Sequence, residues 1–109
     1  MKSLFLLITL AFSFAQAVPI KLALNWKPEP QFGGFYQAEA DGLYKKENLE
    51  VEIMPGGSGT PTIQMLANGK IDAAIVSAEE IIISNSRNPK SPVVAIFATF
   101  QTNPHMIMT

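Results

Sequence analysis

The chain has 109 residues, with 8 basic and 9 acidic side chains, a net charge of −1 and no cysteine. A charge so close to balance leaves no basic surface for nucleic acid or anionic lipid. The lack of cysteine excludes both a disulfide framework and a lipid-acceptor cysteine.

The amino-terminal segment has the pattern of a secretion signal. Lys2 gives a positive start, residues 4–14 form an apolar run, and residues 15–17 (AQA) are a small-x-small cleavage site. A run of 11 residues is too short to cross a membrane, whose hydrocarbon is about 30 Å thick. We expect cleavage after Ala17 and export to the periplasm. Residues 18–109 then carry 7 basic and 9 acidic side chains, a net charge of −2.

Two strands and a helix are predicted in the first half of the mature chain. Residues 20–25 (IKLALN) and 49–54 (LEVEIM) alternate as strands do. Between them, residues 32–40 carry apolar side chains near helical spacing, and Asp41-Gly42 supplies a stop. A further helical turn is expected over residues 44–47.

The same alternation continues in the second half. Thr60-Pro61, as N-cap and first helical position, predicts a helix that ends at Asn68-Gly69. Residues 71–76 (IDAAIV) read as a buried strand. The capping-box sequence Ser77-Ala78-Glu79-Glu80 then predicts a helix that runs to Arg87.

A fourth strand is predicted over residues 93–100 (VVAIFATF), an apolar run that follows the turn cluster at residues 88–92. Strands that alternate with helices form right-handed βαβ units. The expected fold class is therefore α/β, with a parallel sheet covered by helices on both faces.

Ligands of open parallel sheets bind beyond the carboxyl ends of the strands. The turns at residues 26–31, 55–60 and 77–79 should meet there. In the first, Trp26 is either a stacking surface for a flat ligand or a core residue. In the second, PGGSGTP either brings backbone N–H groups to a ligand at a helix N-terminus or is only a flexible connection. The residues alone leave both questions open.

No enzyme constellation is visible in the sequence. His105 is the only histidine, so a metal has no pair of imidazoles, and no serine nucleophile has an identifiable partner. The glycine-rich turn lacks the Gly-Lys-Ser/Thr of a phosphate loop. We therefore expect no catalytic residue, no metal and no cofactor. Of the two neighbouring glutamates, Glu79 is the better candidate to face a ligand.

Three stretches carry a resemblance to a known family. They are LNWKPEPQFGGFYQAEADGLYKKENLEVEI, GGSGTPTIQMLANGKIDAAIVSAEEII and SPVVAIFATFQTNPHMIM, which together span most of residues 21–108. In this order they resemble the amino-terminal part of substrate-binding proteins of ABC importers, in the group that joins thiamine-pyrimidine receptors with sulfonate and nitrate receptors.

The resemblance implies a type II periplasmic binding protein, with two α/β lobes that close on a small solute and hand it to an ABC permease in the inner membrane. A thiamine-pyrimidine precursor is such a solute. The turns after the first three strands then belong to the ligand cleft, with Phe100 and Gln101 behind them. The residues so implied are Trp26, Gln31, Gly57, Ser58, Gly59, Thr60, Ser77, Ala78, Glu79 and Gln101.

The same resemblance extends to thiamine-pyrimidine synthases, which share the fold and use pyridoxal phosphate and iron. Those enzymes carry a histidine in the turn before the first helix, where this chain has Gln31. Gln31 and the export signal favour the receptor. A third reading is a truncated, non-functional product, because residues 18–109 cover only the amino-terminal part of a first lobe.

Overall fold

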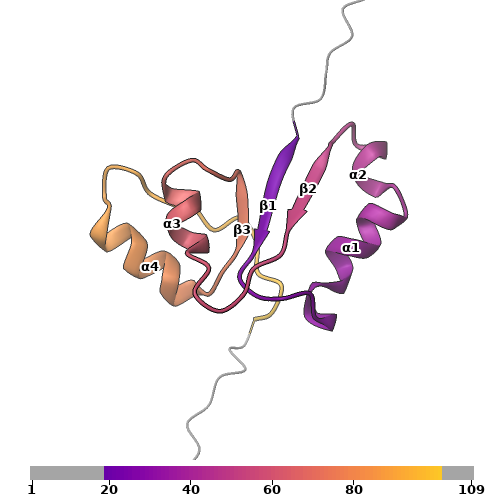
Figure 1. Cartoon of the computed structure of the whole chain (residues 1–109). Helices are drawn as coiled ribbons and strands as arrows, with labels where there is room; N and C mark the ends of the chain where they lie inside the picture. The colour runs from indigo at the N-terminus through magenta and orange to yellow at the C-terminus, as the bar shows by residue number, and fades with distance from the viewer. Residues whose placement is uncertain (1–18, 102–109) are drawn as a thin grey trace, which may run out of the picture.

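The computed structural model describes residues 19–101, so the predicted secretion signal and His105 lie outside the described residues. Three strands alternate with helices (Figure 1). The elements in chain order are β1 (Ile20–Leu24), the 3-10 helix η1 (Pro30–Phe32), α1 (Gly33–Ala40), α2 (Leu43–Lys46), β2 (Val51–Met54), α3 (Thr62–Ala67), β3 (Ala73–Ile75) and α4 (Ala78–Arg87). Within the described residues, no helix is long and apolar enough to cross a membrane.

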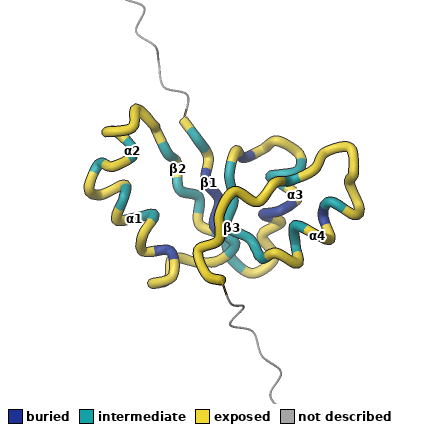
Figure 2. Tube along the Cα trace, turned by 180° about the vertical axis from the view of Figure 1, so that it is seen from behind, coloured by how far each residue is buried: buried dark blue, intermediate teal, exposed yellow. Residues whose placement is uncertain are grey.

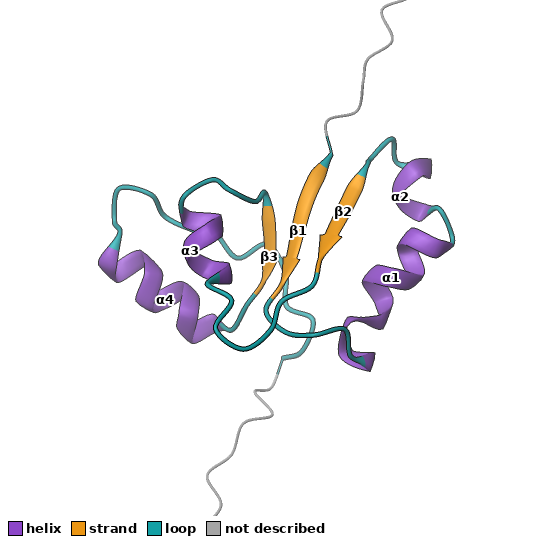
Figure 3. Cartoon of the chain, viewed as in Figure 1, coloured by secondary structure: helices purple, strands orange, loops and turns teal. Residues whose placement is uncertain are grey.

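The strands form one parallel sheet in the order β2-β1-β3. The chain moves from β1 to β2 on one side and then to β3 on the other side of β1. Right-handed crossovers therefore place α1 and α2 on one face and α3 on the opposite face, as Figure 3 shows. The expected α/β fold with a parallel sheet between helices is confirmed.

The core surrounds the central strand. Leu22, Ala23 and Leu24 of β1 are buried, and Leu24 has no exposed surface. Phe32 of η1, Ile63 of α3 and Ile71 are buried as well. Figure 2 shows most of the other helical residues as exposed or intermediate. A central strand is buried on both faces, which explains its nearly continuous apolar sequence.

Asp72 explains why the ladder between β1 and β3 begins at Ala73. Its side-chain Oδ2 accepts from the Lys21 backbone N–H at 2.9 Å, and its own N–H donates to the Lys21 carbonyl at 3.1 Å. The pairing of Leu22 with Ala73 follows directly. The one charged residue in the predicted strand at 71–76 thus secures the amino end of the sheet.

The capping box at the start of α4 is confirmed. The Ser77 hydroxyl accepts from the Glu80 N–H at 3.3 Å, and the Glu80 carboxylate accepts from the Ser77 N–H at 2.9 Å. The N-cap predicted at Thr60 is wrong, since α3 begins at Thr62 and Pro61 precedes it without a side-chain cap. The Thr60 carbonyl instead accepts from the Thr62 N–H at 2.9 Å, which keeps Thr60 in the preceding turn.

The strand predicted over residues 93–100 is not formed. Both backbone groups of Val93 bind the Asn85 side chain, whose Nδ2 donates to the Val93 carbonyl at 2.9 Å and whose Oδ1 accepts from the Val93 N–H at 2.7 Å. A side-chain amide thus replaces the neighbouring strand at the start of this segment. The apolar side chains that follow are exposed, and Ile96 is 83% exposed.

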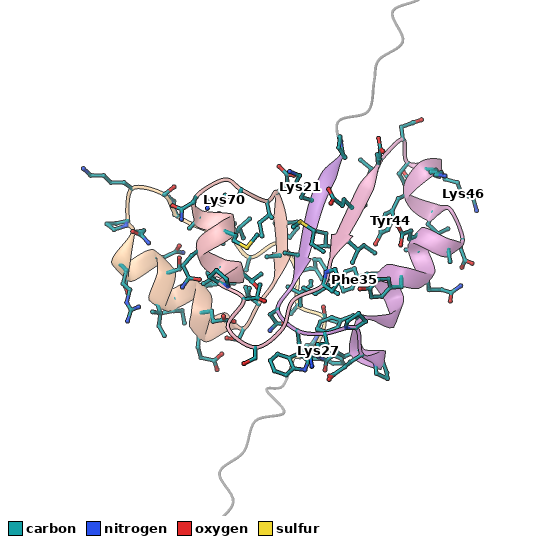
Figure 4. All side chains as sticks on the ribbon, in the orientation of Figure 1. Lys21, Lys27, Phe35, Tyr44, Lys46 and Lys70 are labelled. Carbon is teal, nitrogen blue, oxygen red and sulfur yellow. The ribbon has the colours of Figure 1, made fainter. Side chains whose placement is uncertain are left out.

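Tyr44 joins α2 to α1. Its hydroxyl donates to the Phe35 carbonyl at 3.2 Å, and Figure 4 shows the two residues on neighbouring turns of the helical pair. Burial, and secondarily the charge of Glu39, raises the pKa of Tyr44 above the ordinary 10.0. Both effects favour the neutral phenol, which is the form that can donate.

Replacing Tyr44 with phenylalanine should lower the free energy of unfolding by about 1 kcal/mol, because one partly buried hydrogen bond is lost. Since folding raises this pKa, the stabilisation is complete below pH 10.0 and falls as pH rises through the folded-state value. Urea unfolding of the full-length protein at neutral pH and above pH 10.0 measures both effects. Equal stability of the two proteins at neutral pH would contradict the hydrogen bond.

Candidate functional site

The turns that follow the three strands lie at one edge of the sheet. In Figures 1 and 3 the strands point toward this lower edge, and the loops from β1, β2 and β3 leave there toward η1, α3 and α4. Since β1 is the central strand, its turn lies between the other two. We call residues 25–31, 55–61 and 77–80 the carboxyl-edge turns.

The central turn presents Trp26 and is anchored by Phe32. Trp26 is 39% exposed, whereas Phe32 is 3% exposed. The indole is thus partly accessible, and the neighbouring phenylalanine provides the hydrophobic anchor of η1. Gln31 is exposed on η1, and Figure 4 shows Lys27 at the same edge. An aromatic face, an amide and an ammonium group are therefore available from this one turn.

The second turn is a compact glycine-rich bend. The Thr60 N–H donates to the Gly57 carbonyl at 3.1 Å, and Gly59 between them has a φ of 79°. A positive φ at the third residue is the geometry of a type II turn, which glycine adopts without strain. Ser58, Gly59 and Thr60 are exposed, and Gly57 is half-buried. The bend therefore presents two hydroxyls and accessible backbone.

This second turn is bound to the first through a residue that the sequence prediction left out of the site. The Gly56 N–H donates to the Trp26 carbonyl at 3.0 Å. The pairing of Ala23 with Met54 in the sheet brings the two turns together at this point. In the sequence, the two glycines at residues 56–57 indicate that a close backbone contact is possible there. Only the strand register shows which of the two lies against β1.

The third turn combines Ser77 with the first turn of α4. Ser77 is half-buried, and Ala78 and Glu79 are exposed. A hydroxyl has one donor and two acceptor positions, so the cap at Ser77 uses one acceptor and leaves the hydroxyl hydrogen to donate elsewhere. Glu80 is held in the capping box.

Negative charge prevails among the carboxyl-edge turns. They contain one basic side chain, Lys27, and three acidic ones, Glu29, Glu79 and Glu80, which gives a net charge of −2. The two glutamates of α4 also lie in its first turn, where they compensate the positive end of the helix dipole. Within these turns, Lys27 is therefore the one cationic side chain that an anion could meet.

Gln101, the remaining predicted site residue, is exposed and is the last described residue. Figures 1 and 2 show the described chain ending at the same lower edge as the three turns. Phe100 beside it is 65% exposed. The structure thus places Gln101 at the same end of the sheet as the three turns.

The described residues contain no group of three or more histidine, cysteine, aspartate or glutamate side chains that could hold a metal ion. The chemistry that the three turns offer consists of an aromatic face, hydroxyls, an amide and backbone groups. Groups of these kinds can bind and orient a small molecule through hydrogen bonds and stacking.

Several known proteins are similar to this chain. The formylaminopyrimidine-binding protein of Halalkalibacterium halodurans is 26% identical over 89 residues, which are 82% of this chain and 26% of that protein. YtlA of Bacillus subtilis, which is named as a binding protein without a stated ligand, is 29% identical over 72 residues, 66% of this chain and 22% of YtlA. The 4-amino-5-hydroxymethyl-2-methylpyrimidine phosphate synthase of Candida albicans is 26% identical over 77 residues, 71% of this chain and 22% of the synthase.

The chain thus spans about a quarter of the length of these relatives, 22–26% in each case. The family model described as "NMT1/THI5 like" matches residues 29–109, which include the second and third carboxyl-edge turns and η1. This match covers most of the chain, and the observed α/β sheet agrees with a lobe of a periplasmic binding protein. The chain belongs to the NMT1/THI5-like family.

Proposed function

We propose that this protein is the substrate-binding component of an ABC importer and that its ligand is an aminopyrimidine of the kind from which thiamine is made. Residues 18–109 would form the amino-terminal part of its first lobe, exported to the periplasm after cleavage at Ala17. The lobe would close with a second lobe over the solute, and an ABC permease in the inner membrane would receive it.

The observation that carries the proposal is the set of carboxyl-edge turns in a chain of this family. Trp26 supplies a partly exposed aromatic face, and Ser58, Thr60 and Ser77 supply hydroxyls from the other two turns at the same edge of the sheet. A flat heterocycle with ring nitrogens and an amino group can stack on the indole and form hydrogen bonds with the hydroxyls.

The charge of the same turns supports a pyrimidine over a sulfonate or nitrate. A net charge of −2 at the edge, with Glu79 and Glu80 beside Ser77, opposes an anion and favours a neutral or protonated amine. The formylaminopyrimidine-binding protein, which is similar over 82% of this chain, has a ligand of this chemical class in its name.

The second candidate is a pyrimidine phosphate synthase on the same scaffold. It is favoured by one observation, the 26% identity to the Candida albicans enzyme over 77 residues. Gln31 opposes it, because the resemblance expects a histidine there and an amide cannot act as a nucleophile or base in the same way. We therefore rank this candidate second.

Calorimetric titration of the full-length protein with 4-amino-5-hydroxymethyl-2-methylpyrimidine tests the proposal. We expect saturable binding to one site with a Kd on the order of 1 μM or lower, a free energy of about −8 kcal/mol. Nitrate and ethanesulfonate, tested at a hundredfold higher concentration, should neither bind nor compete.

Binding of ethanesulfonate or nitrate but not the pyrimidine would overturn the ligand class. If none of the three compounds binds, the proposal that the protein is a receptor for these solutes is wrong. Incubation with pyridoxal phosphate and iron, followed by chromatography, separates the second candidate: formation of a pyrimidine phosphate would establish the synthase instead.

A further inference from the structure

Gly56 occupies a position where the backbone of another strand fills the space of a side chain. A Cβ atom at residue 56 would overlap the Leu24 carbonyl oxygen and would lie 2.8 Å from the Asn25 carbonyl carbon and 2.9 Å from the Trp26 nitrogen. By contrast, a Cβ at the adjacent Gly57 would meet nothing within 4 Å. Backbone atoms cannot rotate away as a flexible side chain can, so this contact requires glycine.

The same residue is also hydrogen-bonded to the turn that it touches. Its N–H donates to the Trp26 carbonyl at 3.0 Å, so Gly56 contacts the peptide units on both sides of Trp26. Close packing and a directed bond together leave the backbone at Trp26 little freedom to shift. The direction of the indole depends on that backbone, because a side chain has only a few staggered positions relative to it.

We infer that Gly56 is a positioning residue, which holds the glycine-rich turn and the Trp26 turn together as one rigid unit and thereby fixes the direction in which the indole faces a ligand. The contact with ligand is made by Trp26 and by the bend at residues 57–60, and Gly56 acts through both. The inference rests on the proposed function for its effect on affinity, but the coupling of the two turns exists without ligand.

Replacing Gly56 with alanine tests this inference. Gly34→Ala is the matched control, because Gly34 lies on α1, outside the carboxyl-edge turns, and a Cβ there would meet nothing within 4 Å. The added methyl at residue 56 must displace the Leu24–Trp26 backbone by on the order of 1 Å to restore ordinary separations. The same methyl at residue 34 meets open space. The two variants add the same atoms, but only the methyl at residue 56 meets the backbone of the Trp26 turn.

The first readout needs no ligand. The full-length protein is labelled with 5-fluorotryptophan, and the ¹⁹F resonance of Trp26 is assigned by its loss in Trp26→Phe. We expect this resonance to shift or broaden in Gly56→Ala and to stay in place in Gly34→Ala. An unmoved resonance in a folded Gly56→Ala protein overturns the coupling, whether or not the protein binds a pyrimidine.

The second readout is affinity for 4-amino-5-hydroxymethyl-2-methylpyrimidine. Gly56→Ala should weaken binding at least tenfold, and Gly34→Ala should leave it unchanged. A moved Trp26 resonance with unchanged affinity would overturn the positioning role. If the wild-type protein does not bind the pyrimidine, the proposed function is contradicted. The ¹⁹F measurement then tests the coupling of the two turns by itself.

If Gly56→Ala does not fold, hydrogen exchange in the wild-type protein carries the test. The Gly56 amide, bonded to the Trp26 carbonyl, should exchange at least tenfold more slowly than the amide of exposed Gly59. Equal exchange of the two amides would overturn the coupling, because a rigid junction cannot open as often as a turn tip.

Discussion

Replacing Leu24 with alanine is expected to lower the free energy of unfolding by about 3 kcal/mol, because the change leaves a cavity in the centre of the sheet. Leu24 is fully buried on the central strand and pairs with Ile75 of β3. The strand is flanked on both sides, so the surrounding backbone cannot easily collapse into the space. Urea unfolding of the full-length protein, followed by circular dichroism, measures the loss.

Ile82→Ala is the matched control for this substitution. It also removes carbon atoms from a large aliphatic side chain, but Ile82 lies on α4 and is 69% exposed. The expected loss is below about 0.5 kcal/mol, as for most surface changes. A Leu24→Ala protein as stable as Ile82→Ala would mean that β1 does not lie at the centre of the core.

The elements that the sequence predicted correctly are those whose signals are local. The Ser77–Glu80 capping box, with its two reciprocal hydrogen bonds, involves residues three apart, so the pattern alone determines where α4 starts. Likewise the apolar composition of β1 can be read from its own residues, and it agrees with the burial of Leu22, Ala23 and Leu24. Such features need no knowledge of distant contacts.

The segment at residues 93–100 shows the opposite case. Its apolar composition satisfies the requirements of a buried strand, but a strand also needs a neighbour with free backbone groups. Asn85, eight residues earlier, binds both backbone groups of Val93, and composition gives no sign of this. The side chains of Val94, Ile96 and Phe97 are consequently exposed rather than buried in a sheet.

The candidate site also has some features that the sequence predicts and others that depend on tertiary contacts. Parallel strands place their carboxyl ends together, so the meeting of the three turns could be predicted from the strand order. The contact between Gly56 and the Trp26 turn could not, since it depends on the register that pairs Ala23 with Met54. Which residues hold the three turns together is thus a tertiary property, whereas the turns themselves can be located from the sequence.

Trp26→Ala is expected to weaken pyrimidine binding by the full-length protein at least tenfold, or about 1.4 kcal/mol, if the indole is the stacking face of the proposed cleft. Trp26→Phe retains a flat ring and should weaken binding only about threefold. With 39% of its surface exposed, Trp26 contributes less to the core than Leu24 does, so both variants should fold. Calorimetric titration with 4-amino-5-hydroxymethyl-2-methylpyrimidine gives the three affinities.

Leu43→Ala provides the control, because Leu43 is 45% exposed, similar to Trp26, but lies on α2 away from the carboxyl-edge turns (Figure 1). Its affinity should equal that of the wild type. If Trp26→Ala binds as tightly as Leu43→Ala, the indole does not stack on the ligand, and the hydroxyls of Ser58, Thr60 and Ser77 would have to supply the recognition. If Trp26→Phe is as weak as Trp26→Ala, the indole N–H rather than the ring face makes the contact, since phenylalanine lacks that donor.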